Sequence, residues 1–112
     1  MLDNMFDFFL AVGNYEDRKV ARFDAPWGFV DTVQVCDGSQ PFETAVQHPD
    51  YNGGGMVIVE AYDTMKEAQV GHDKWVAKMT AKRLPSKLVD CANAAMAKAF
   101  LGKQSFPRIK KQ

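Results

Sequence analysis

Residues 56–79 constrain the fold most, because this one stretch carries the signals of a strand, a helix start and an amphipathic helix. MVIVEAY at 56–62 is typical of a strand, and its unbroken apolar start indicates a central strand or one covered on both faces. TMKE at 64–67 fits the capping box, in which Thr64 and Glu67 bond free amide groups where a helix begins. The sequence therefore predicts a strand followed directly by a capped helix.

Apolar residues recur along this helix at steps of three and four, which predicts one face packed on a sheet. The residues of this stripe are Met65, Ala68, His72, Trp75, Val76 and Met79. On another face lie Lys74, Lys78 and Lys82, which we expect to be solvated. These lysines are also candidate contacts for an acidic partner surface, although no aromatic residue is interleaved with them for base stacking.

His72 decides whether this stretch is a site or part of a core. It shares the apolar stripe with Trp75 and Met79, so we expect a buried, structural histidine bonded to a backbone carbonyl. A catalytic or ligand role would need convergent partners. The other histidine, His48, lies in a loop, and a metal site of His48, His72, Cys36 and Asp50 lacks ligand spacing.

The segment before residue 56 reads as a series of short strands joined by turns. We expect strands around Lys19 to Phe23, at 29–36 and at 42–47, with DAPWG and DGSQ as turns. Short connections predict an antiparallel meander of three or four strands. Gly53–Gly55 indicates a hairpin loop with positive φ at Asn52-Gly53, because a strand follows it where a phosphate loop would lead into a helix.

We expect two further helices, one at each side of this region. SKLVDCANAAMAKAFLG at 86–102 places Leu88, Ala92, Ala95 and Ala99 on one stripe, with Gly102 as its C-cap. Residues 1–13 form a short amphipathic N-terminal helix. The expected fold class is α+β: a three- or four-stranded antiparallel meander with two C-terminal helices packed on one face, plus the N-terminal helix. The expected divisions are 1–13, a single domain at 14–102 and a basic C-terminal tail at 103–112.

The two ends are expected to contact partners and to lie apart from the core. Phe8 falls off the N-terminal apolar stripe, so one packed face cannot hide it. Pro107 prevents a continuous helix in the tail, where apolar residues stand among basic ones. The expected partner contacts at the two ends are Phe6, Phe8, Phe9, Leu10, Phe106, Arg108, Ile109, Lys110 and Lys111.

Charge is unevenly distributed along a chain of 112 residues and zero net charge. Residues 1–63 have a net charge of −8 and residues 64–112 a net charge of +8. This asymmetry indicates complementary faces within the fold or between copies of it. The acidic half would repel phosphate, so we do not expect free nucleic acid to be the sole partner.

Other features set the expected environment. No apolar run approaches the ~20 residues that span a bilayer, and Asp3 and Asp7 interrupt the N-terminal apolar stretch, so we expect a soluble protein without a signal peptide or membrane partner. Cys36 and Cys91 are expected to be buried thiols.

The sequence offers no constellation typical of an enzyme. GxSxG, HExxH and CxxC motifs are absent, no carboxylate pair lies on one short element, and neither cysteine has a placed base. We therefore expect a non-enzymatic protein without a cofactor, a metal or a small-molecule ligand.

Several strings together resemble a group of small proteins encoded by tailed bacteriophages. They are NYEDRKVARFD, DGSQPFETAVQHPDYNGG, VIVEAYDT, GHDKWV and LPSKLVD, and the likeness covers residues 14 to about 91. The resemblance implies no enzymatic activity. A small phage protein without a catalytic constellation is typically either a virion component or an intracellular binder, and the charge asymmetry and apolar ends favour repetitive assembly. We therefore expect a small virion component, such as a capsid cement, head-tail or tail accessory subunit, in contact with other phage structural proteins or copies of itself. Two alternatives stay open: an intracellular protein that binds and modulates a host protein, in host takeover or antidefence, and a small nucleic-acid-associated protein. The expected location is the virion or the host cytoplasm.

Overall fold

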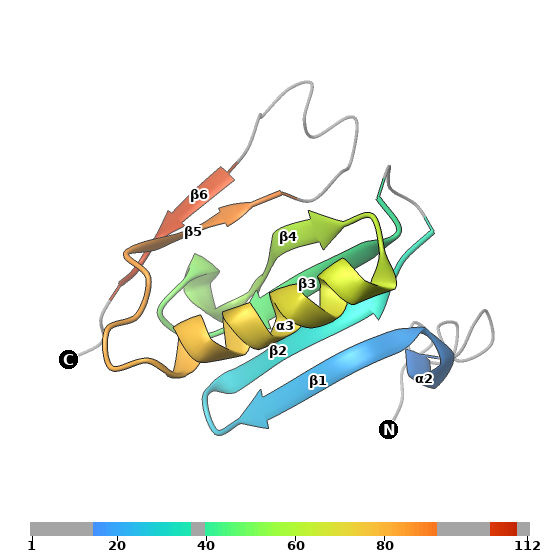
Figure 1. The fold of residues 1–112 in the computed structure, drawn as a ribbon. Coiled ribbons are helices and arrows are strands. Elements are labelled where there is room, and N and C mark those ends of the chain that lie inside the picture. Colours follow the sequence, from blue (N-terminus) through green and yellow to red (C-terminus); the bar gives the residue numbers. More distant parts are fainter. Residues whose placement is uncertain (1–14, 37–39, 92–103, 110–112) are drawn as a thin grey trace, which may run out of the picture.

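Four antiparallel strands and one long helix make the main body of the protein (Figure 1). The computed structural model describes residues 15–36, 40–91 and 104–109. The strands follow one another across the sheet in the order β1-β2-β3-β4. Their bounds are β1 Lys19–Ala25, β2 Gly28–Gln34, β3 Phe42–Gln47 and β4 Met56–Tyr62. The predicted antiparallel meander is confirmed, with β3 and β4 at their expected bounds.

The remaining elements flank this sheet. Helix α3 (Met65–Thr80) crosses one face of it, and the short helix α2 (Tyr15–Arg18) leads into β1 (Figure 1). A second sheet of two antiparallel strands, β5 (Lys87–Asp90) and β6 (Gln104–Pro107), lies beside β4. The Cys91 amide donates to the Ile58 carbonyl over 2.8 Å, which ties the end of β5 to β4.

A two-residue turn connects the first two strands of the meander. Ala25 pairs with Gly28, so Pro26 and Trp27 alone connect β1 to β2. A Cβ atom at Gly28 would overlap the carbonyl oxygen of Gln47 on β3, and its φ of 153° also favours glycine.

The loop between β3 and β4 contains a short 3-10 helix, η1 (Asn52–Gly54). Asn52 and Gly53 have φ of 52° and 61°, which confirms the positive φ predicted for this pair.

The predicted capping box is present at the start of α3, with one of its two donors shifted by one residue. The Glu67 amide donates to Thr64 Oγ1 over 3.1 Å, so Thr64 is the N-cap. Glu67 Oε1 in turn accepts from the Asp63 amide over 3.2 Å, one residue before the donor that the motif predicts. Both ends of the motif therefore hold the chain as it leaves β4.

The core lies between α3 and the sheet and continues to β5. Its main cluster joins buried residues of β2, β3, β4, α3 and β5 with the 48–55 loop: Val30, Val46, Tyr51, Val57, Met79 and Leu88. A smaller cluster of Phe42, Tyr62 and Ala68 closes the other end of α3. Burying each large side chain contributes roughly 2 kcal/mol, so this layer supplies most of the driving force for folding.

The α+β class is confirmed, but the predicted second C-terminal helix is wrong over its first turn. Residues 87–90 form strand β5, in which Leu88 is 1% exposed while Val89 faces outward. This alternation is satisfied by pairing with β6, whose residues follow 14 or more positions later. The rest of that helix, residues 92–102, and the predicted N-terminal helix at 1–13 lie outside the described residues.

The C-terminal segment is packed against the body, where the sequence indicated a tail apart from the core. Phe106 on β6 packs against the main cluster. The Arg108 amide donates to the Ser86 carbonyl over 2.8 Å, and the Ile109 amide donates to the Asp50 carbonyl over 2.7 Å. Residues 104–109 therefore belong to the folded unit.

Within the described residues, no helix is both long enough and apolar enough to cross a membrane.

Candidate functional site

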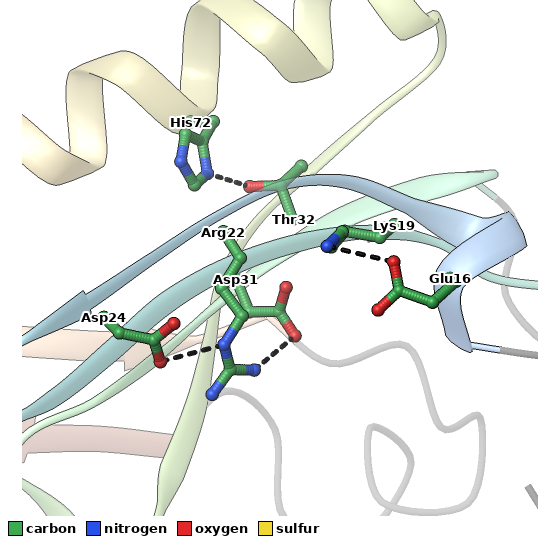
Figure 2. A network of polar contacts seen from close by, with 7 residues as sticks. All are labelled: Glu16, Lys19, Arg22, Asp24, Asp31, Thr32 and His72. Carbon is green, nitrogen blue, oxygen red and sulfur yellow. Dashed lines mark hydrogen bonds and ion pairs between the residues drawn. The ribbon is translucent and has the colours of Figure 1, made fainter.

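A row of polar side chains crosses the sheet beneath α3. His72 Nδ1 lies 2.8 Å from Thr32 Oγ1, which lies 2.6 Å from Thr44 Oγ1. Thr44 Oγ1 is 3.0 Å from the Tyr62 hydroxyl. Figure 2 shows the His72 ring pointing down from α3 to Thr32 on β2. The row exists because Thr32 and Thr44 are paired in the register of β2 and β3 and both side chains face the helix.

Glu60 ends this row and receives three hydrogen bonds. Its Oε1 accepts from the Tyr62 hydroxyl at 3.2 Å, from Trp75 Nε1 at 2.9 Å and from Lys74 Nζ at 2.6 Å. Thr44 pairs with Glu60 while Ala45 pairs with Ile58, so Val59 is an extra residue in β4. This bulge shifts the alternation by one residue, which brings Glu60 and Tyr62 to the helix side together with Val57.

The protonation states in this row follow from burial and bonding. Burial lowers the pKa of His72, although Asp73 and Asp31 oppose it in part, so the ring is neutral at pH 7. Burial raises the pKa of Tyr62, which stays protonated. Burial alone would raise the pKa of Glu60, but the bonds from Lys74 and Trp75 outweigh it and lower the pKa. The row therefore holds one ionised, paired carboxylate among neutral groups.

An open pocket of about 510 Å³ adjoins the Glu60 end of the row. Gly71 lies against the Tyr62 ring so closely that a Cβ atom there would overlap it. Val70, on the outer side of α3, lines the pocket and is 64% exposed. The other lining residues are Gln40, Glu60, Ala61, Tyr62, Asp63, Lys66, Glu67, Gly71 and Lys74.

A second polar cluster fastens the C-terminal segment to the 48–55 loop. Arg108 Nε donates to Asp50 Oδ2 over 2.9 Å, and His48 Nδ1 accepts from the Asp50 amide over 3.0 Å. The His48 ring lies 4.9 Å from the Trp27 ring and 5.5 Å from the Tyr51 ring, centre to centre. Burial lowers the pKa of His48, with Asp50 opposing and Arg108 adding to the effect.

His48 and His72 thus belong to separate clusters. Of the four residues weighed as a metal set from the sequence, His48 and Asp50 come together. His72 is bonded to Thr32 beneath α3, and Cys36 is exposed at the far end of β2. No group of three or more His, Cys, Asp or Glu side chains that could hold a metal occurs in the part of the chain that the structure describes.

The sheet face opposite α3 carries an arginine with several partners. Arg22 lies 3.0 Å from Asp24 and 3.1 Å from Asp31 (Figure 2). Its guanidinium stands 4.2 Å from the centre of the Phe29 ring. Lys19 similarly pairs with Glu16 of α2 over 3.1 Å (Figure 2).

The residues predicted on α3 differ in their surroundings. His72 is 6% exposed, as the stripe predicted, but its hydrogen-bond partner among the described residues is the Thr32 hydroxyl, where a backbone carbonyl was expected. Trp75 is half-buried against the main cluster, whereas Met65 of the same stripe is 46% exposed.

The expected lysine face is only partly a solvated one. Lys74 is bonded to Glu60, and Lys78 Nζ stands 4.9 Å from the Trp75 ring centre. Lys82 is exposed.

Among the expected contacts at the ends, Phe106 and Arg108 are used within the fold, and Ile109 is 64% exposed. Phe6, Phe8, Phe9, Leu10, Lys110 and Lys111 lie outside the described residues.

The expectation that both cysteines are buried thiols is wrong for Cys36. Cys36 is exposed just beyond β2, and Cys91 is partly exposed at the end of β5.

Sequence reasoning missed four members of the row: Thr32, Thr44, Glu60 and Tyr62. The threonines carried a partial signal: Thr44 stands between Phe42 and Val46 on the inward face of its strand, and Thr32 follows the apolar Val30 by two residues. Glu60 carried none, because its orientation depends on the bulge.

No protein-family model, no curated protein and no solved structure matched this chain in the three comparisons made.

Proposed function

We propose that this protein is a non-enzymatic structural or assembly protein of a tailed bacteriophage. It is a small virion component, such as a capsid cement, head-tail or tail accessory subunit, and it acts through protein-protein contacts. The resemblance of residues 14 to about 91 to the phage group supports this assignment.

One observation carries the proposal: the polar groups of the row beneath α3 are bonded inward, while apolar side chains stand exposed on the outside of the same helix. Glu60, Tyr62 and His72 bond to neighbours beneath α3, where they hold the helix on the sheet. Met65 and Val70 are exposed on the same helix. Exposed apolar side chains on a small protein are typical of surfaces that meet a partner.

The test is mass spectrometry of purified particles from the source phage, with the cleared host lysate as the comparison. We expect the protein in the particles at a fixed ratio to known structural proteins. Recovery only from the lysate, in a stable complex with a host protein, would replace this proposal with the intracellular binder.

A matched pair of variants locates the contact. Val70→Asp introduces a charge at an exposed apolar position and should reduce incorporation into particles, with little change in thermal stability. Gln69→Asp places the same charge at the neighbouring exposed position and should leave incorporation unchanged. Equal incorporation of both variants would remove the outer surface of α3 from the contact.

A further inference from the structure

The molecule has two ends of opposite charge, set by the direction of its strands. Lys19 pairs with Val33, and Phe42 pairs with both Gln34 and Tyr62. These pairs place α2 and the start of α3 at the same end of the sheet (Figure 1). We call this the acidic end, because its four exposed carboxylates, Glu16, Asp17, Asp63 and Glu67, outnumber its two exposed lysines, Lys19 and Lys66. Lys19 is paired with Glu16.

Helix α3 runs from the acidic end to the opposite one, where the chain turns toward β5. The Tyr51 hydroxyl donates to the Pro85 carbonyl over 2.6 Å, which fixes this connection against the 48–55 loop. We call this the basic end, because exposed cations gather on the last turn of α3 and the segment that follows it: Lys78, Lys82, Arg83 and Lys87.

The cations of the basic end are largely unused by the fold. Lys78 stands over the Trp75 ring. Among the described residues, Lys82, Arg83 and Lys87 form no ion pair with a carboxylate. Unpaired cations on a fixed segment attract an anionic surface at little cost in ordering.

The basic end is also hollowed. An open hollow of about 460 Å³ is lined by Lys78, Ala81, Arg83, Leu84, Pro85 and Ser86. Its lining combines aliphatic carbon from Leu84 and Pro85 with two cationic side chains. Such a lining fits an apolar side chain that has carboxylates beside it.

The acidic end presents that combination. Met65 is 46% exposed on the first turn of α3, between Asp63 and Glu67 in sequence. Thioether side chains are flexible and fill irregular hollows well. Asp63 and Glu67 are exposed, and the capping bonds of Glu67 hold this turn in place.

We propose that copies of this protein associate head to tail, with Met65 of one copy in the hollow at the basic end of the next. Asp63 and Glu67 then face Arg83 and Lys78 across the contact. The two surfaces differ, so the contact is heterologous, and a pair of copies keeps one free acidic end and one free basic end. Repetition produces a ring if the rotation closes and a filament if it does not. This inference rests on the proposed function only in that both assign the protein a role in repeated contacts.

The test is sedimentation of the purified protein over a concentration series at low and at high salt. The wild-type protein should form concentration-dependent oligomers that loosen as salt rises, because exposed charge pairs are screened over about 8 Å at physiological ionic strength. Arg83→Glu and Asp63→Arg should each weaken the association about tenfold, since each replaces attraction with repulsion. Met65→Ser should weaken it without changing the charge.

The charge-swapped double variant separates this contact from a general effect of net charge. Arg83→Glu with Asp63→Arg restores complementary ends and should regain association. Arg83→Glu with Asp73→Arg has the same net charge, but Asp73 is exposed midway along α3, so this control should stay weak. Equal behaviour of the two doubles, or a wild-type protein that stays monomeric at every concentration, would overturn the inference. If the protein is found in particles but is monomeric in solution, the proposed function stands and the head-to-tail contact is refuted. If it forms these oligomers but is absent from particles, the head-to-tail contact stands and the proposed function is refuted.

Discussion

At position 71 of α3 the close approach of the Tyr62 ring leaves space for hydrogen only. At an exposed position in the interior of an ordinary helix, replacing glycine by alanine stabilises the folded protein by roughly 0.5–1 kcal/mol. Here the sign should reverse, because the new methyl group forces the helix from the sheet or displaces Tyr62 from Thr44 and Glu60. Gly71→Ala should cost about 1–3 kcal/mol of unfolding free energy in chemical denaturation. Gln69→Ala, at an exposed position of the same helix, is the control and should not destabilise.

His72 is expected to be structural. His72→Gln should lower the free energy of unfolding by about 1–3 kcal/mol, because the buried Thr32 hydroxyl loses a well-placed partner. Binding of a partner at a permissive temperature should survive. Asp73→Asn, an exposed neighbour, should change neither property. Retained stability with lost binding would show that His72 acts in function.

The two histidines predict how stability depends on pH. Burial lowers the pKa of His72 and of His48 below the value of about 6.5 of an unfolded chain. Between the folded and the unfolded pKa the unfolded state binds more protons, so stability rises with pH there. This contribution is complete above pH 6.5 and is lost as pH falls through the folded values. Denaturation of the wild-type protein at pH 7.5 and 5 should show the loss, and His72→Gln should show a smaller one.

At the scale of elements, the sequence predicted what local signals determine. β3, β4 and α3 were found because alternation, β-branched residues and the capping box all act within a few residues. β5 was missed because Leu88 also fits a helical stripe. Its strand state depends on Phe106 and its neighbours, which come much later in the chain. In the candidate site, the burial of His72 was predicted from the same local periodicity. Its bond to Thr32, 40 positions away, depends on tertiary structure.

The attachment of β6 predicts a cost for changes in the C-terminal segment. Phe106→Ala should lower the free energy of unfolding by about 2 kcal/mol, because its ring packs against the main cluster. Arg108→Gln should cost about 1 kcal/mol through the loss of the half-buried ion pair with Asp50. Thermal denaturation measures both changes. Ile109→Ser is the control, because Ile109 is exposed and its replacement should change the free energy of unfolding little. A loss of stability equal to that of Phe106→Ala would mean that burial does not determine the size of these effects.

At the scale of the whole molecule, both core clusters of the described residues lie between Val20 and Phe106. Phe8 falls off the apolar stripe of the N-terminal segment, so we expect that segment to contact partners. Deleting residues 1–12 should then leave a domain that unfolds in one cooperative step, although contact with partners is lost. Calorimetry and particle incorporation check the two parts of this prediction. A shortened protein without a cooperative transition would place the N-terminal segment in the core.

The bond between Asp50 and Arg108 joins residues 58 positions apart, and this has a consequence for the order in which the chain acquires structure. During synthesis the meander and α3 can form as their residues emerge, because their pairings are between neighbours in sequence. β5 has no strand partner until β6 has been made. Distant contacts of this kind slow folding, since a long loop must close before they stabilise anything. A nascent chain that stops before residue 104 would therefore lack the cover of Phe106 on the main cluster and leave β5 with an unpaired edge, which makes it prone to aggregate and a target for chaperones.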